Sequence, residues 1–160
     1  MADRLAKLTE ECGYHILGGT IGTKCFFTAL SEYGHADVVY KTVINPDYPG
    51  YAHWINSGMT TFCENWDMSS SLNHHMFSEV DYWFYKYIAG FRFDGGVLKI
   101  NPCKIDGLTV VNARYRDVKL EINGDDLNIS LHEPTEIEWG GKNYLLDKGK
   151  HIIKLSSGSK

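Results

Sequence analysis

A change of hydrophobic period near Gly96 constrains the fold of this chain more than any other feature. Before it, apolar residues recur at helical spacing, and Gly13 and Gly34 end two of the helical stretches. After it, short stretches such as 118–122 alternate apolar and polar side chains, which is typical of strands with one buried face. Helices come first and strands follow without alternation, so the sequence predicts an α+β fold.

Helices are predicted over residues 2–12, 24–33, 36–44, 51–57 and 74–89. In the first of them Leu5 and Leu8 are expected to face inward, and Thr23 is expected to cap the second. The two helices on either side of Gly34 are joined by very few residues, so they must run nearly antiparallel.

The strands are expected to form an antiparallel β-sandwich, because they are short, closely spaced and separated by turn residues. Asn123-Gly124 is a strong hairpin signal between two of them. The predicted strands cover residues 97–100, 108–111, 118–122, 127–131, 136–139, 144–146 and 151–155.

A step in composition divides the chain near Phe93. Most aromatic residues precede it, and those that follow are Tyr115, Trp139 and Tyr144. We therefore predict a helical domain over residues 1–93 and a β domain over residues 94–160.

Charge and composition exclude several classes of function. The net charge of −4 and the lack of a basic patch argue against a nucleic-acid partner. No stretch is apolar enough to span a membrane, and the first residues lack a signal core, so the compartment stays open. The four cysteines form no CxxC pair and are expected to be buried, reduced thiols.

Residues 58–67 are the stretch most suited to chemistry, because they place one carboxylate, Glu64, among hydroxyl, apolar and indole side chains. The apolar neighbours predict a partly desolvated carboxyl group with a raised pKa, which suits a general base that holds a water. A structural alternative is a capping box, with Thr61 as N-cap and Glu64 three residues later. The next clear helix begins ten residues further on, which favours the base.

The residues after this stretch suggest a partner for Glu64. His74 and His75 are adjacent, so in a helix they would point about 100° apart and only one would face a common target. Asn73 is expected either to cap that helix or to line the site. No third ligand has metal-site spacing, so neither a metal nor a cofactor is predicted. Trp54 and Trp66 are candidates to stack on sugar faces, although a lone Trp in a helical wall is more often core.

Taken together, these pieces resemble the C-terminal part of α-L-rhamnosidases of glycoside hydrolase family 78. The resemblance covers roughly residues 12–92, and the β part more weakly. Cys63 and Tyr51 stand where the family often has Trp. The matching pieces, in chain order, are Gly22-Thr23, Tyr48-Pro49, Gly58-x-Thr60-Thr61-x-x-Glu64-x-Trp66-Asp67, Ser71-Leu72-Asn73-His74 and Ala89-Gly90.

The resemblance implies the last part of an (α/α)6 barrel followed by a β-sandwich. It implies hydrolysis of terminal α-L-rhamnose in a glycan or glycoside, with inversion by two carboxylic acids. Glu64 corresponds to the family's general base, His74 to a sugar contact and Trp66 to a pocket wall.

The family's general acid lies upstream of the matched segment, so the resemblance implies that this chain is a fragment and inactive alone. Inversion needs two carboxyl groups about 6.5–9.5 Å apart. A fragment of a barrel is expected to self-associate or to need a missing N-terminal portion. Two alternatives stay open, a non-catalytic carbohydrate-binding or structural module and the end of another (α/α)6 glycosidase or phosphorylase.

Overall fold

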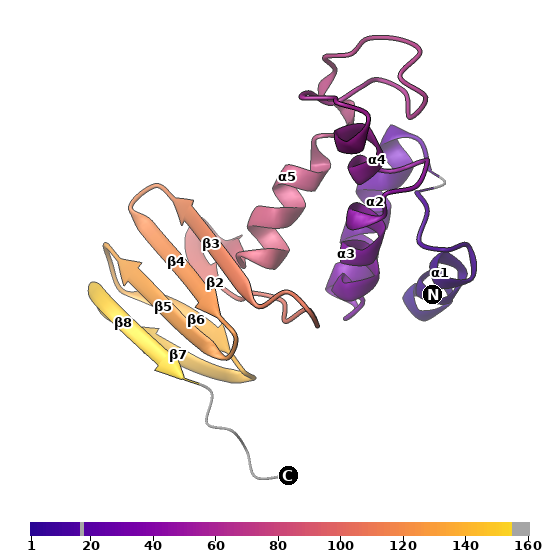
Figure 1. Cartoon of the computed structure of the whole chain (residues 1–160). Helices are drawn as coiled ribbons and strands as arrows, with labels where there is room; N and C mark the ends of the chain where they lie inside the picture. Colours follow the sequence, from indigo (N-terminus) through magenta and orange to yellow (C-terminus); the bar gives the residue numbers. More distant parts are fainter. Residues whose placement is uncertain (17, 155–160) are drawn as a thin grey trace. The chain divides into compact units, whose positions relative to one another are not determined.

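A computed structural model describes residues 1–16 and 18–154 of the chain (Figure 1). The chain is α+β, with helices first and strands afterwards. It divides into two compact units, Met1–Trp83 and Phe84–Lys160, and this division lies earlier than the predicted boundary after Phe93. Within the described residues no helix is long and apolar enough to cross a membrane.

The first unit is helical. α2 and α3 pack side by side, as their short connection requires (Figure 1). The core includes Phe27, Leu30 and Val39, and Trp83 donates its indole N–H to Ser31 Oγ over 2.7 Å. The helices are α1 (Ala2–Glu11), α2 (Thr20–Glu32), α3 (Ala36–Ile44), α4 (Tyr51–Asn56) and α5 (Glu79–Trp83), with a 3-10 turn, η1 (His75–Phe77), before α5.

Two expectations for the first helices are wrong. In α1 the buried side chains are Ala6 and Thr9, whereas Leu8 is 45% exposed. α2 begins at Thr20, so Thr23 lies inside its first turn rather than at its cap. The Thr23 hydroxyl is buried and donates to Gly19 O over 3.0 Å, a bond back to the preceding turn.

The single helix expected over residues 74–89 is instead three short pieces: η1, α5 and a π turn, η2 (Phe84–Ile88). The first break has a visible cause. The carbonyl of Phe77, which would accept an N–H within a continuous helix, accepts the buried hydroxyl of Tyr51 over 2.8 Å. The Asp81 N–H bonds instead to Ser78 O over 3.0 Å, so a new helical turn begins there.

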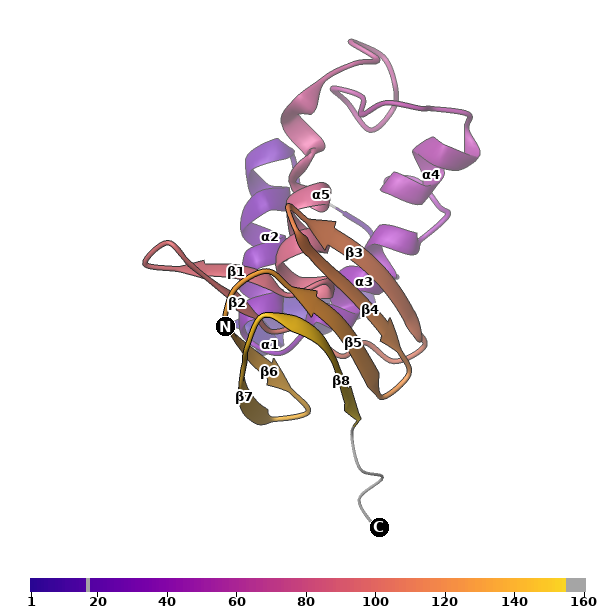
Figure 2. The same cartoon turned by 90° about the vertical axis from the view of Figure 1, so that its left-hand side faces the viewer.

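The second unit consists of two four-stranded sheets, with orders β1-β2-β6-β7 and β3-β4-β5-β8 (Figure 2). Buried residues of both sheets, such as Ile100, Leu127 and Ile137, form one hydrophobic cluster, as in a sandwich. The strands are β1 (Phe91–Asp94), β2 (Val97–Ile100), β3 (Val110–Tyr115), β4 (Val118–Asn123), β5 (Asp126–Leu131), β6 (Thr135–Trp139), β7 (Lys142–Leu146) and β8 (Gly149–Lys154).

The β unit differs from the expected antiparallel sandwich in two ways. β2 and β6 pair in parallel, with Ile100 opposite Ile137, while the other pairs are antiparallel. β1 pairs with β2 although its sequence was not predicted as a strand. Residue 155, the predicted end of the last strand, lies outside the described residues.

The cysteines are all free thiols, but they are not uniformly buried as predicted. Cys63 is fully buried and its burial raises the pKa of the thiol. Cys12 and Cys25 are exposed, and Cys103 is half-buried.

Candidate active site

The segment from Met59 to His74 is a loop between α4 and η1 that folds back on itself. The N–H of Glu64 donates to Ser71 O over 2.8 Å, and the N–H of His74 donates to Phe62 O over 2.8 Å. The two arms of the loop therefore run side by side. This pairing brings Glu64 and His74, ten positions apart in sequence, onto neighbouring stretches of backbone.

The structure does not support the capping-box alternative. No helix begins at Thr61, which lies in the loop, and its hydroxyl bonds to the carbonyl of Leu72 across the two arms. Glu64 therefore has no helix terminus to cap, and its carboxylate turns to other partners.

The carboxylate of Glu64 is held through one of its two oxygens. Oε2 accepts the Ser70 hydroxyl over 2.7 Å and the Ser71 N–H over 3.3 Å. These hydrogen bonds hold the pKa of Glu64 below its usual range. The predicted rise in pKa is thus wrong, because hydrogen bonding to the ionised form outweighs desolvation. Within the described part of the chain, Oε1 accepts no hydrogen bond.

His74 is oriented by the backbone that follows it. It has an extended conformation, and its Nδ1 accepts the Met76 N–H over 3.3 Å, which makes it the N-cap of η1 in place of Asn73. Because Nδ1 acts as the acceptor, the proton of the neutral ring belongs on Nε2. The rings of His74 and His75 stack, with centroids 5.5 Å apart and planes at 12°, so the divergence expected in a helix is wrong.

Trp66 anchors the loop to the helical core. Its ring stacks on Trp54, with centroids 4.4 Å apart, and lies 4.2 Å from the ring of Phe77. Its indole N–H donates to Gly18 O over 3.3 Å, which ties the loop to the glycine-rich turn before α2. A Cβ on Gly18 would meet the backbone of Gly22 at 3.3 Å, so the turn needs a small residue at this position.

Trp54 and Asn73 differ in accessibility. Trp54 is 2% exposed and donates its indole N–H to Trp66 O over 2.9 Å, which leaves no ring face for a sugar. The expectation that Trp54 stacks on substrate is therefore replaced by a supporting role beneath Trp66. Asn73 is exposed, and its side-chain amide makes no hydrogen bond to other described residues.

Comparison with known proteins decides the family. The sequence model of the bacterial α-L-rhamnosidase six-hairpin glycosidase domain matches residues 1–88, more than half of the chain. The chain belongs to this family. It is 33% identical over 100 residues to an α-L-rhamnosidase of Streptomyces avermitilis, covering 56% of this chain and 10% of that protein. An α-L-rhamnosidase of an Alteromonas species is 31% identical over 100 residues, covering 56% of this chain and 11% of that protein.

The rhamnosidase fold extends through both units. The crystal structure of the Streptomyces avermitilis α-L-rhamnosidase in complex with L-rhamnose has a TM-score of 0.85 to this chain at 23% identity. The superposition covers 97% of this chain and 19% of that one. This chain therefore spans about a tenth of the curated relatives' length and about a fifth of the solved structure.

Sequence reasoning missed several residues that build the candidate site. Ser70 holds the carboxylate of Glu64, and Gly18 supplies a carbonyl to Trp66. Phe77 and Tyr51 pack against Trp66, with ring centroids 4.2 Å and 5.2 Å away. The run of serines after Asp67 is the one sequence signal that could have pointed to Ser70. The fold brings the other residues to the site from distant parts of the sequence. Within the described residues, no three His, Cys, Asp or Glu side chains gather to hold a metal.

Proposed function

We propose that this chain is part of an inverting α-L-rhamnosidase, in which Glu64 is the general base that activates water. The observation that carries the proposal is the asymmetric carboxylate: Oε2 is held by Ser70 and Ser71, while Oε1 is left to accept a hydrogen bond from water. Membership of the six-hairpin glycosidase family supports a glycoside as substrate. The naming of the matched relatives as α-L-rhamnosidases supports α-L-rhamnose.

The proposed step begins with an ionised Glu64, which its lowered pKa ensures at neutral pH. Oε1 takes a proton from the bound water as the water oxygen attacks the anomeric carbon. Attack comes from the face opposite the leaving group, so the configuration inverts. The glycosidic C–O bond breaks in the same step, and the second carboxylic acid protonates the departing oxygen. A carboxyl group of low pKa stays ionised over a wider pH range. It is also a weaker base towards the water that it deprotonates.

The neighbouring side chains take binding roles in this proposal. The proton expected on Nε2 of His74 would be donated to a sugar hydroxyl. Trp66 would form a wall of the pocket, with Trp54 beneath it. The exposed amide of Asn73 offers both a donor and an acceptor to a further hydroxyl.

The second carboxylic acid is proposed to come from a segment outside these 160 residues, as the family resemblance implies. The helices before Phe84 would then be the last helices of an (α/α)6 barrel, which the description of the matched domain as a six-hairpin glycosidase supports. The chain alone is expected to hydrolyse no rhamnoside. Turnover by the purified 160 residues would contradict this part of the proposal.

The role of Glu64 is tested in an enzyme that contains this segment together with the rest of the barrel. Glu64→Gln should lower kcat about 10²–10⁴-fold, the usual contribution of a general base. Glu64→Ala with added azide should form a β-configured rhamnosyl azide, because azide needs no base to attack the anomeric carbon. Asp67→Asn is the matched control, since it removes a charge from the same loop but keeps the Oδ1 acceptor of the Ser69 N–H. An active Glu64→Gln enzyme, or loss of azide product, would refute the role.

A further inference from the structure

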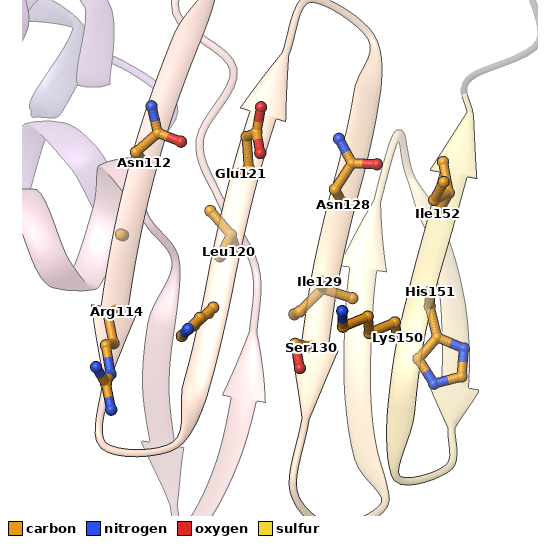
Figure 3. A pocket seen from close by; sticks show the side chains of 12 residues that line it. Asn112, Arg114, Leu120, Glu121, Asn128, Ile129, Ser130, Lys150, His151 and Ile152 are labelled. Atoms are coloured by element: carbon orange, nitrogen blue, oxygen red, sulfur yellow. The ribbon is translucent and has the colours of Figure 1, made fainter.

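The outer face of the β3-β4-β5-β8 sheet carries a second polar site, in the second unit of the chain. A pocket of about 570 Å³ lies on this face, lined by side chains from all four strands (Figure 3). Outward side chains of neighbouring strands line up across an antiparallel sheet according to register. The pairing of these strands therefore sorts the lining residues into two rows.

The first row combines two amides, one acid and one apolar side chain. Asn112 lies opposite Glu121, Glu121 opposite Asn128, and Asn128 opposite Ile152, and Figure 3 shows this row across the four strands. Glu121 makes no ion pair within the described part of the chain. Ile152 is 66% exposed. Amide and carboxylate groups beside an apolar surface match a ring that carries hydroxyls.

The second row is cationic. Arg114 lies directly opposite Lys119, Lys119 opposite Ser130, and Ser130 opposite Lys150. None of the three cations makes an ion pair with another described residue. Like charges directly opposite each other destabilise a sheet, so the Arg114 and Lys119 pair is a local cost. Such a cost is most often found where a site has a function.

The next row of the same face shows that this arrangement is not general. There Lys154 lies opposite Asp126 and forms an ion pair with it over 3.3 Å. A cation on β8 is thus neutralised at that position, whereas Lys150, four residues earlier on the same strand, is not. On this face, the unpaired cations of the pocket therefore contrast with the neutralised cation of the row beside it.

We propose that this face binds an oligosaccharide that carries uronate groups. The cations donate N–H groups to the carboxylates. Arg114 and Lys119 lie on neighbouring strands about 4.8 Å apart, a spacing close to the length of one pyranose ring, and Lys150 lies two strands beyond Lys119. The row of Asn112, Glu121 and Asn128 accepts the hydroxyls between them. A polyphosphate and an acidic peptide both lack ring hydroxyls for this row. The inference rests on the proposed function only in choosing a saccharide, because the charge argument is independent of Glu64.

The test is calorimetric titration of the complete 160-residue chain with a linear oligogalacturonate, and with the same oligosaccharide after full methyl esterification. Binding of the acid but not of the ester is expected, because esterification removes the charge and keeps the ring. Lys119→Gln and Lys150→Gln should each weaken binding about tenfold, as loss of one charge-assisted hydrogen bond implies. Lys148→Gln is the matched control: it is exposed, lies in the turn before β8, and should bind as the parent chain does.

Any of three binding results with the parent chain would overturn the proposal. They are no binding of oligogalacturonate, equal binding of its methyl ester, and equal binding of polyglutamate, which would indicate an acidic peptide partner. Equal weakening by Lys148→Gln would also overturn it, since the effect would then be one of net charge. Glu64→Gln should leave the titration unchanged, so failure of the uronate site and failure of the catalytic proposal are seen separately.

Discussion

Replacing Trp54 tests whether the helical core holds the candidate catalytic loop in place. Its ring stacks on Trp66 at 4.4 Å and meets Phe77 at 5.5 Å and Tyr51 at 5.7 Å. Its indole N–H donates to the backbone carbonyl of Trp66 over 2.9 Å. Trp54→Ala removes both kinds of contact, while Trp54→Phe keeps a ring and removes the donor.

The expected magnitudes follow from burial and contacts. Trp54 is 2% exposed, so truncation to Ala leaves a cavity and should cost about 3–5 kcal/mol of unfolding free energy. Trp54→Phe should cost less, about 1–2 kcal/mol, chiefly from the unsatisfied carbonyl of Trp66. Ile55→Ala is the matched control, because Ile55 is the next residue, is 70% exposed, and should change the free energy by less than about 0.5 kcal/mol.

Two measurements on the 160-residue chain check this reasoning. Urea unfolding followed by far-UV circular dichroism gives the stability of the helical unit without depending on tryptophan emission. Hydrogen exchange read by mass spectrometry should show faster exchange at the Glu64 and His74 amides in Trp54→Ala, because the paired arms of the loop lose their support. A cost below about 1 kcal/mol for Trp54→Ala, or loop exchange unchanged from Ile55→Ala, would refute the supporting role.

Three further predictions concern the pH dependence, the backbone and the association state. Ser70→Ala should raise the pKa of Glu64 and move the acid limb of the pH–rate profile of the complete enzyme upward. The parent limb should lie below the ordinary titration range of a glutamate carboxyl, because hydrogen bonds from Ser70 and Ser71 lower the pKa of Glu64. Ser69→Ala should leave the limb unchanged, because the Ser69 hydroxyl does not touch Glu64. Gly90→Ala should lower the free energy of unfolding by at least about 3 kcal/mol, because φ is +76° and a Cβ would lie 2.2 Å from Pro102 N. Gly107→Ala is the control: it also has a positive φ but no such clash, and it should lower the free energy by about 1 kcal/mol. Urea unfolding measures both. The isolated chain should self-associate in sizing measurements through exposed apolar residues such as Ile21, which is 76% exposed, and a monomer at all concentrations would contradict this.

The stability contribution of Glu64 has a defined sign as well. Its pKa is lower in the folded chain than in the unfolded one, so its hydrogen bonds stabilise the fold above the unfolded value. That stabilisation is lost as the pH falls through the folded pKa. If Glu64 is the base we propose, the acid limb of activity and this loss of stability belong to the same carboxyl group, and Ser70→Ala should shift both.

The strands could be predicted because their signal is local. A period of two in stretches such as Val118–Asn123 survives in the structure as alternating buried and exposed side chains. β1 escaped prediction because Phe91 and Phe93 continue the aromatic composition of the helices before them. The parallel pairing of β2 with β6 depends on contacts between distant residues, which no short stretch of sequence records.

The loop that carries Glu64 was singled out from its residue types, but its hydrogen bonding was not predicted. Apolar neighbours of Glu64 suggested desolvation, yet their side chains pack into the ring cluster and leave the carboxylate to Ser70. The relation of His74 to His75 was inferred from helical geometry, and it failed because His74 is extended. In both cases the missing information was which backbone groups the side chains would satisfy.

The aromatic residues of the first unit show why composition alone misleads about binding. A ring can stack on a sugar only if one of its faces is uncovered. The ring of Trp54 is buried against Trp66, and its N–H donates to the backbone of the loop that carries Glu64. This loop has no regular secondary structure between α4 and η1, so little besides these rings, the Gly18 carbonyl and the hydrogen bonds between its arms can fix the carboxylate. Rigid placement of a general base is worth more than one additional sugar contact, because a misplaced base loses catalysis even when substrate binds. The ring cluster is therefore better explained as the support of the loop that carries Glu64, the proposed base, than as a carbohydrate platform.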